Sequence, residues 1–182
     1  QTRMPFDLRG KTLGIMGLGR LGGMVANIAP AFGLKVIAWS ENLTAERCAE
    51  VGAELVSKED LFRRADIVTI HMLLSDRSTG LVTAREFGLM KPTAVLVNTS
   101  RGPIVDQTAM IDVLKSGKIR GAAVDVYDHE PLPEDSPLRG LDRLVMTPHT
   151  GYVSEDTYQL FYGQMVENIK AWHAGSPTRE IG

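Results

Sequence analysis

The sequence predicts an α/β fold in which helices flank a doubly wound parallel sheet of about seven strands. Short β-branched runs alternate along its 182 residues with longer amphipathic segments, and a glycine-rich turn directly follows the first run. Several runs are apolar nearly throughout, as strands are when both faces of a parallel sheet are covered. Strand–helix–strand alternation of this kind favours a doubly wound sheet, in which the active chemistry lies at the carboxyl ends of the strands.

The order of the expected elements follows from these runs and from the helix starts. Strands are expected at residues 11–17, 35–40, 66–72, 93–99, 121–127 and 143–149, with a weaker one at 53–56. Helices are expected at residues 20–32, 44–51, 58–64, 83–89, 106–116 and 154–174. Thr83 and Glu86 have the spacing of a capping box, in which each side chain accepts a hydrogen bond from a free backbone N–H group. Asp106 and Ser154 are expected N-caps.

Composition narrows the class of protein. The apolar fraction is 43% and the net charge is −2, so the charge does not indicate a nucleic-acid or anionic membrane partner. No stretch reaches the roughly 20 apolar residues of a membrane-spanning helix, and residues 1–10 lack the apolar core of a signal peptide. The single Cys48 cannot form an internal disulfide and is expected to be an inert thiol. We therefore expect a cytoplasmic protein without a bound metal.

A glycine-rich turn opens the first expected helix. The segment "GIMGLGRLGGMVA" places Gly17, Gly19 and Gly22 directly between a strand and a helix. The first glycine permits a tight turn, the second lets the backbone approach a pyrophosphate, and the third lets the helix pack close to the strand. The unpaired N–H groups at the helix start, around Arg20 and Leu21, offer a positive dipole end to phosphates. This context predicts a Rossmann-like binding site for a dinucleotide.

The residue at the end of the second strand bears on the choice of dinucleotide. An Asp or Glu there would hydrogen-bond the adenosine ribose and disfavour a 2′-phosphate, but this sequence has Ser40. Glu41 and Asn42 follow, and no Arg or Lys lies close by in the sequence to bind a 2′-phosphate. In an alternative interpretation, Ser40 and Asn42 only cap the helix at 44–51.

We therefore expect NAD as the cofactor and leave NADP open. The small, neutral Ser40 removes the repulsion against a 2′-phosphate without supplying an attraction. A preference for NADP would require a basic side chain that is distant in the sequence, such as Arg20 or Arg47, to reach that phosphate.

Three segments place polar side chains at the ends of the fifth, sixth and seventh strands. Arg101 lies in "VNTSRGPIVD", Glu130 in "VDVYDHEPLP" and His149 in "MTPHTG". These strand ends share one edge of the sheet with the glycine turn, so the side chains are expected to converge where a nicotinamide ring would lie. Taken alone, His149 could be a structural residue, Arg101 a surface arginine and Glu130 the start of a loop.

Together, these motifs resemble those of the nucleotide-binding domain of the D-isomer-specific 2-hydroxyacid dehydrogenases, and the resemblance runs from about residue 8 to the end. That family is marked by the GxGxxG turn, an "N-T/S-x-R-G" segment, a "D-V-x-x-x-E-P" segment and a "P-H-x-G" segment, in that order. This sequence has all four. Four ordered motifs are more specific than any one of them, so the resemblance favours a catalytic His149 over a structural one.

The resemblance implies hydride transfer between a nicotinamide cofactor and a small 2-hydroxy or 2-keto acid of D configuration. His149 would protonate the oxygen of the keto acid, a role that suits imidazole because it exchanges protons near neutral pH. Glu130 would hydrogen-bond the other ring nitrogen and fix the tautomer. Arg101 would hold the substrate carboxylate as a two-pronged clamp and polarise the carbonyl.

The resemblance also implies which residues contact the cofactor. Asp125 and Thr99 would lie on the nicotinamide side, and Met72, Leu73 and Ser78 would line the adenosine side. Asp125 lies on a buried strand, where a carboxylate without partners is costly, so we expect it to be paired. The remaining histidines are expected to be structural or uninvolved: His71, His129 and His173.

The family consists of two-domain enzymes that are much longer than this chain. By resemblance, residues 1–152 form the dinucleotide-binding domain, and residues 153–182 form a crossover helix and a tail remnant that lead to a substrate domain largely absent from this chain. Such a fragment is expected to bind dinucleotide but to turn over poorly alone. The resemblance also implies a homodimer, with the helix after Gly22 and the loop "EPLPEDSPL" as candidate surfaces.

Other functions within this family stay open. A corepressor branch keeps Arg101, Glu130 and His149 and uses the fold as a nicotinamide-sensing module that dimerises. Phosphite dehydrogenases keep the same three residues, whereas formate dehydrogenases typically carry Gln at the position of Glu130. We expect the enzyme, because the sequence contains no partner-binding or nuclear-targeting tail. The keto acid cannot be named, because its side chain would mainly contact the other domain.

Overall fold

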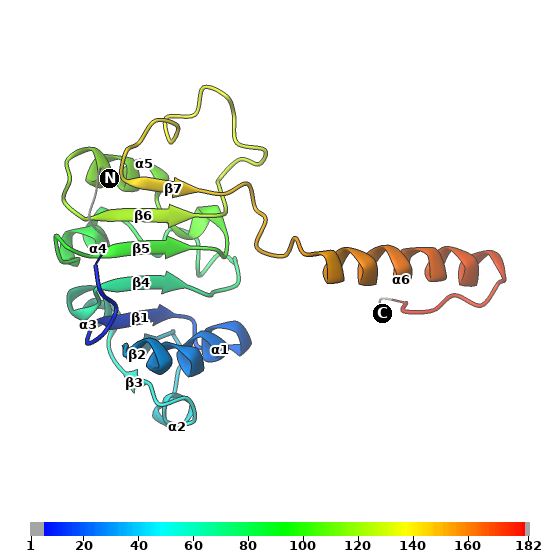
Figure 1. Cartoon of the computed structure of the whole chain (residues 1–182), viewed down its shortest axis with the longest axis horizontal. Helices are drawn as coiled ribbons and strands as arrows, with labels where there is room; N and C mark the ends of the chain where they lie inside the picture. Colours follow the sequence, from blue (N-terminus) through cyan, green and yellow to red (C-terminus); the bar gives the residue numbers. More distant parts are fainter. Residues whose placement is uncertain (1–5, 181–182) are drawn as a thin grey trace. The chain divides into compact units, whose positions relative to one another are not determined.

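In the computed structural model, which describes residues 6–180, the chain divides into two compact units, Gln1–Pro148 and His149–Gly182. Within the described part of the first unit, seven strands form one sheet in which every pair is parallel. The strand order is β3-β2-β1-β4-β5-β6-β7, and the carboxyl ends point to one edge (Figure 1). The order reverses between β1 and β4, and doubly wound sheets bind ligands beyond the strand ends at such a switch point. The predicted fold class is confirmed.

Each predicted strand is present and is shorter than its predicted range. The strands are β1 (Thr12–Met16), β2 (Lys35–Trp39), β3 (Glu54–Leu55), β4 (Ile67–Ile70), β5 (Val95–Asn98), β6 (Gly121–Val124) and β7 (Leu144–Met146). The strands end before most of the candidate site residues, which therefore lie on the loops that follow. This is the usual arrangement in α/β proteins, where a rigid sheet positions functional loops.

The helices begin and end close to their predicted positions. They are α1 (Arg20–Ile28), α2 (Ala45–Ala49), α3 (Lys58–Arg64), α4 (Ala84–Leu89), α5 (Gln107–Lys115) and α6 (Glu155–His173), with the 3₁₀ turns η1 (Ala29–Phe32) and η2 (Gly102–Ile104). The first predicted helix tightens into η1 at Pro30, which cannot donate the backbone hydrogen bond that an α-helix needs there. Thr83 and Glu86 form the predicted capping box, and Asp106 and Ser154 are N-caps as expected.

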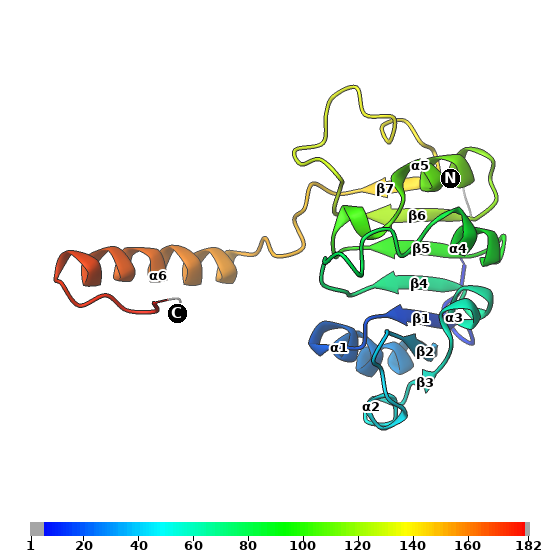
Figure 2. The ribbon, with the colours of Figure 1, turned by 180° about the vertical axis from the view of Figure 1, so that it is seen from behind.

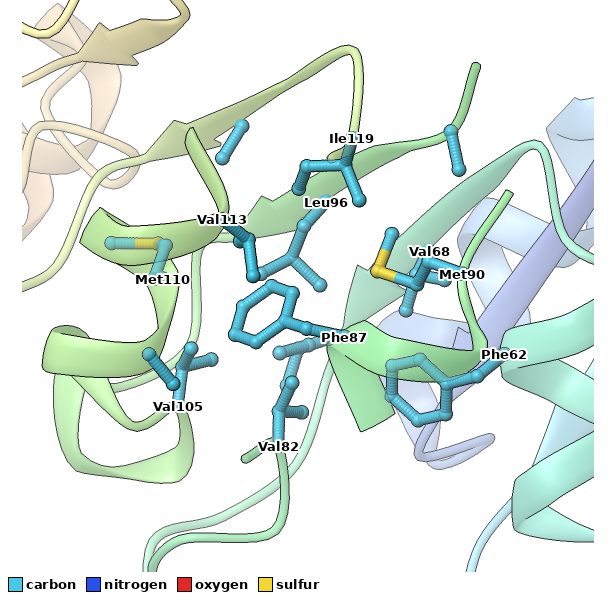
Figure 3. Packing of buried hydrophobic residues seen from close by; sticks show 14 of the residues in the cluster. Phe62, Val68, Val82, Phe87, Met90, Leu96, Val105, Met110, Val113 and Ile119 are labelled. Atoms are coloured by element: carbon cyan, nitrogen blue, oxygen red, sulfur yellow. The ribbon is translucent and has the colours of Figure 1, made fainter. Parts of the chain in front are cut away.

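Hydrophobic clusters cover both faces of the sheet. Figures 1 and 2 show the sheet and its helices from opposite sides. Helices α3, α4 and α5 cover one face, where Phe62 and Phe87 lie in one cluster with Leu96 (Figure 3). Helix α1, η1 and α2 cover the other face. Along β2, Ile37 belongs to the first cluster, whereas its neighbour Val36 belongs to the second. Burial on both faces explains why the strand sequences are apolar nearly throughout.

The single cysteine lies in the core. Cys48 on α2 is a free thiol and is 1% exposed. Burial raises the pKa of the Cys48 thiol, despite the opposing charge of Arg47. A neutral, buried thiol is a poor nucleophile, so Cys48 contributes packing. Among the described residues, no group of His, Cys, Asp or Glu is arranged to hold a metal ion.

The described part of the second unit consists of α6 and the segments on either side of it. Ser154 caps α6 by accepting the Thr157 N–H at 3.2 Å. Arg179 ties the following segment to the helix through Glu167 and Asn168. No helix within residues 6–180 is both long and apolar enough to cross a membrane. The units divide after Pro148, a few residues before the expected boundary at 152, and the role of residues 153–182 as a crossover stays a prediction.

Candidate active site

The three predicted glycines differ in what surrounds them. A Cβ atom on Gly17, which has a φ of +92°, would lie 2.5 Å from the His71 carbonyl oxygen, and a Cβ on Gly22 would lie 2.0 Å from the Gly17 carbonyl oxygen. Backbone packing therefore requires these two glycines. A Cβ on Gly19 would meet nothing within 4 Å, so this glycine faces open space. Gly19 is the position where a ligand could approach the backbone most closely.

Helix α1 starts at this open space. Gly19 is its N-cap and has no side chain to occupy the free N–H groups of the first turn, which include those of Arg20 and Leu21. The Leu21 side chain is 60% exposed. Free N–H groups and the positive end of the helix dipole suit a pyrophosphate. The glycine turn thus fits the phosphates of a dinucleotide.

Ser40 lies at the end of β2 and faces the glycine turn. Its hydroxyl oxygen accepts the Leu18 N–H at 3.3 Å. The N-cap of α2 is Thr44, whose side chain accepts the Arg47 N–H. The alternative interpretation, in which Ser40 and Asn42 cap this helix, is therefore wrong, because a residue closer to the helix takes that position.

The fold brings a basic side chain to the same turn. Arg47 of α2 donates from Nε to the Leu18 carbonyl oxygen at 3.2 Å and from Nη2 to the Gly19 carbonyl oxygen at 3.5 Å. Its Nη1 atom binds Glu50 at 2.5 Å. Arg47 is one of the two distant basic residues that the sequence offered for a 2′-phosphate, and it contacts the turn directly.

The loop after β4 carries the residues expected on the adenosine side. Leu73 is 91% exposed, and Met72 is half-buried close to Gly17, where a Cβ would lie 2.8 Å from Met72 Cγ. Ser78 is buried, and its hydroxyl donates to the Leu73 carbonyl oxygen and accepts the Ser75 N–H, each at 2.7 Å. We therefore assign Ser78 to the shape of the loop, with Met72 and Leu73 as the residues on its surface.

His71 lies directly after β4 and contacts that strand. Its Nε2 atom lies 3.0 Å from the hydroxyl oxygen of Thr69 on β4. Burial lowers the pKa of His71, so the ring is neutral at physiological pH. His129 and His173 are exposed, as expected.

The turn after β5 carries Thr99 and Arg101 and is fixed by Asn98, the first residue of the N-T/S-x-R-G motif, to which the sequence analysis gave no role. The Asn98 side chain is buried; its amide donates to the Arg101 carbonyl oxygen at 2.9 Å and its oxygen accepts the Ser100 N–H at 3.1 Å. Thr99 and Arg101 are both exposed. Arg101 donates from Nη1 to the Ser100 carbonyl oxygen at 2.6 Å. An exposed guanidinium on a fixed turn can bind an anion, as a clamp for a carboxylate requires.

Asp125 is buried just beyond β6 and is paired, as expected. Its carboxylate accepts a hydrogen bond from the Thr147 hydroxyl, beyond the end of β7. Its N–H donates to the Asn98 carbonyl oxygen at 3.0 Å. Asp125 thereby joins the segments that follow β5, β6 and β7.

Glu130 folds back toward β6. One of its carboxylate oxygens accepts the Tyr127 N–H at 2.9 Å. The Tyr127 hydroxyl donates to the Thr147 carbonyl oxygen at 2.8 Å. The side chain of Glu130 is exposed, and its bond to the Tyr127 N–H fixes its position. Sequence reasoning missed Tyr127 and Thr147, whose roles depend on contacts between distant segments.

His149 is the first residue of the second unit. Its backbone has a φ of +54°, which is uncommon for a residue with a side chain and is found more often at functional sites. Its ring packs edge-to-face on Tyr152, with centroids 5.9 Å apart. Arg101 and Glu130 belong to the first unit, so the convergence of His149 with them stays a prediction.

Known proteins are similar to this chain in sequence and in fold. A family model described as the D-isomer specific 2-hydroxyacid dehydrogenase, NAD binding domain, matches residues 1–151. The glyoxylate reductase of Aeropyrum pernix is 43% identical over 169 residues, which are 93% of this chain and 50% of that protein. The crystal structure of a phosphoglycerate oxidoreductase from Vibrio cholerae o395 is 34% identical with a TM-score of 0.89, and the match covers 96% of this chain and 56% of that one.

A third similar protein was solved with a bound cofactor. The acyclic imino acid reductase Bsp5, in complex with NADPH and D-Arg, is 32% identical with a TM-score of 0.79, and the match covers 98% of this chain and 56% of that one. The chain thus spans about half the length of these proteins. Its seven-stranded parallel sheet agrees with the fold of the matched structures. The chain therefore belongs to the D-isomer specific 2-hydroxyacid dehydrogenase family, and it carries that family's NAD binding domain.

Proposed function

We propose that the protein transfers hydride between a nicotinamide cofactor, NAD or NADP, and a small 2-keto or D-2-hydroxy acid. One observation carries this proposal: a hydrogen-bonded network in which Tyr127 and Thr147 hold the carboxylates of Asp125 and Glu130 at the carboxyl edge of the sheet. Carboxylates that are fixed at this edge can orient the nicotinamide ring of a cofactor and the imidazole of a general acid. When bound, the cofactor supplies or accepts the hydride.

We assign the proton to His149. Its imidazole would donate a proton to the substrate oxygen as the carbonyl becomes a hydroxyl, and would take that proton back in the reverse direction. Glu130 has one carboxylate oxygen held by the Tyr127 N–H and would accept a hydrogen bond from the other ring nitrogen. That bond would fix the tautomer and stabilise the imidazolium, as the carboxylate does in a Ser-His-Asp triad.

We assign the substrate carboxylate to Arg101. Its side chain is exposed on a turn that Asn98 fixes with two hydrogen bonds. A guanidinium binds a carboxylate through two parallel N–H groups, which sets both the position and the direction of the substrate. The positive charge would also polarise the neighbouring carbonyl. Asp125 and Thr99, on the adjacent segments, are assigned to the nicotinamide side of the cofactor.

The experiment that tests these roles measures the oxidation of NADH and of NADPH by the whole protein with glyoxylate and other small 2-keto acids. We expect His149→Gln to lower kcat by a factor of about 10² to 10⁴, the usual contribution of a general acid, and to leave the affinity for NADH nearly unchanged. The matched control is His129→Gln, which changes an exposed histidine of the first unit and should keep the wild-type rate. A His149→Gln variant that keeps the wild-type kcat would contradict the proposal.

We also propose that the protein is a homodimer. Four apolar side chains on one side of α1 and η1 are 56–60% exposed, namely Leu21, Met24, Ile28 and Phe32. Clustered exposed apolar side chains commonly mark interaction surfaces. Sedimentation should show a dimer that Met24→Glu dissociates and that Thr108→Glu, exposed on α5 at the other face of the sheet, leaves intact. Sedimentation of the wild-type protein as a monomer would contradict this part of the proposal.

A further inference from the structure

Ser40 and Arg47 bind the same backbone residue from two elements. The Ser40 hydroxyl accepts the Leu18 N–H at 3.3 Å, and Arg47 Nε donates to the Leu18 carbonyl oxygen at 3.2 Å. A neutral hydroxyl and a guanidinium therefore lie together beside the glycine turn, at the carboxyl end of β2. In doubly wound dinucleotide-binding sheets, this is where the adenosine ribose lies.

Gly23 provides the space that Arg47 occupies. It lies in the first turn of α1, directly after the third glycine of the motif, and the dinucleotide fingerprint does not account for it. A Cβ atom on Gly23 would lie 2.7 Å from Arg47 Nη2. Glycine weakens a helix relative to alanine, so its presence inside α1 needs a packing reason. We infer that Gly23 keeps the guanidinium against the turn.

Arg47 keeps donors for a ligand. A guanidinium has five N–H groups, and within the described part of the chain three of them donate, to Leu18, Gly19 and Glu50. The ion pair with Glu50 is solvent-exposed, with side chains 38% and 62% exposed, so water weakens it. A phosphate, with a larger charge and several acceptor oxygens, could bind the remaining donors.

The neighbouring charged residues lie on the side of β3 and α3. Glu41, Glu54 and Arg64 line a hollow there that Ser40 also lines, and Arg47 is not part of that hollow. Arg64 binds Glu54 with both of its terminal nitrogens, at 2.8 and 2.6 Å. Arg47, by contrast, binds the glycine turn itself.

We propose that Ser40 and Arg47 form a binding site for the 2′-phosphate of NADPH, so that this chain prefers NADPH to NADH. The inference rests on the proposed function, because it requires a dinucleotide on the glycine turn. Ser40 supplies a hydroxyl without the negative charge that would repel the phosphate, and Arg47 supplies the positive charge. The site selects between cofactors that are otherwise the same, and it has no part in the hydride step.

The test is a calorimetric titration of the 182-residue chain with NADPH, NADH, 2′,5′-ADP and 5′-AMP. We expect NADPH and 2′,5′-ADP each to bind at least about tenfold more tightly than their partners without the 2′-phosphate, as a charge-assisted contact predicts. Arg47→Gln should remove most of this preference, and Arg47→Lys should keep part of it. Ser40→Asp should reverse it, because a carboxylate repels the phosphate and binds the ribose hydroxyls.

Two arginine variants serve as controls, with circular dichroism to check that each variant is folded. Arg64→Gln should leave the ratio of the two affinities unchanged, because Arg64 is bound to Glu54. Arg20→Gln, at the start of α1, should weaken both cofactors alike, because both have the same pyrophosphate. Equal affinity for NADPH and NADH, or a preference lost in Arg64→Gln but kept in Arg47→Gln, would overturn the inference alone. Binding of neither cofactor would overturn the proposed function as well.

Discussion

The hydroxyl of Tyr127 donates a hydrogen bond to the carbonyl oxygen of Thr147 at 2.8 Å, which ties the segment after β6 to the segment after β7. Burial raises the pKa of Tyr127, and the nearby charges of Asp125 and Glu130 raise it further. The phenol therefore stays protonated and remains a donor well into the alkaline range. The backbone N–H of the same residue binds Glu130, so Tyr127 holds Glu130 and the Thr147 segment together.

Tyr127→Phe should separate these two contacts. The variant keeps the ring and the N–H that binds Glu130 but loses the bond to Thr147, so the free energy of unfolding should fall by about 1 kcal/mol. In the whole protein, kcat should fall while KM for the keto acid changes little, because Arg101 is untouched. Tyr162→Phe is the matched control, since this residue is exposed on α6 and its ring packs on Tyr158, outside the network. An unchanged kcat in Tyr127→Phe would rule out the positioning role.

A second prediction concerns acid stability and Glu86, which is 5% exposed. Burial alone would raise the pKa of Glu86, but hydrogen bonds from Thr83 and Lys58 outweigh it, and the pKa lies below its ordinary value. A lowered pKa in the folded state stabilises the protein above the ordinary carboxylate range, and this stabilisation is lost as the pH falls through the folded pKa.

Glu86→Gln should therefore lower the free energy of unfolding at pH 7 by about 1–3 kcal/mol, and the difference from wild type should shrink as the pH falls below about 4. Urea unfolding at several pH values measures this. Glu54→Gln, in an exposed pair with Arg64, should cost less than about 1 kcal/mol at any pH. If the loss of unfolding free energy in Glu86→Gln stays constant down to pH 3, the charge of Glu86 does not contribute to stability.

The architecture was predictable because its signals are local. Apolar runs located every strand, and the capping residue Thr83 located the start of α4. The sequence also contained a signal for the change from α1 to the 3₁₀ turn η1, namely Pro30. The prediction missed this change because the apolar pattern of the helix continues past Pro30.

The candidate site was predictable only where a motif fixes a position in the chain. Ser40 was open to a capping role until the fold placed it against Leu18, and Ser78 was expected on a binding surface but is buried within its loop. The Tyr127 hydroxyl binds the backbone of a distant segment, so its role depends on the tertiary fold. Asn98 binds backbone groups two and three residues later in its own turn, and the motif that contains it does not show these bonds.

The glycine turn allows stability and binding to be separated. Gly22→Ala would place a Cβ atom 2.0 Å from the Gly17 carbonyl oxygen, so the backbone must move, and we expect a loss of about 3 kcal/mol or more in unfolding free energy. Gly19→Ala meets no neighbouring atom within 4 Å and should change stability by less than about 1 kcal/mol. Thermal unfolding of the two variants tests this contrast, and equal losses would show that the turn packs differently.

Binding of NADPH and NADH to wild type and Gly19→Ala, measured by calorimetry, tests the central claim that this edge of the sheet holds a nicotinamide dinucleotide. Gly163→Ala, at another glycine with open space around it, controls for the added methyl group. We predict that wild type and Gly163→Ala bind the cofactors equally, and that Gly19→Ala binds both at least about tenfold more weakly while remaining folded, because the methyl group blocks the pyrophosphate. A folded Gly19→Ala chain that binds as tightly as wild type would contradict the account.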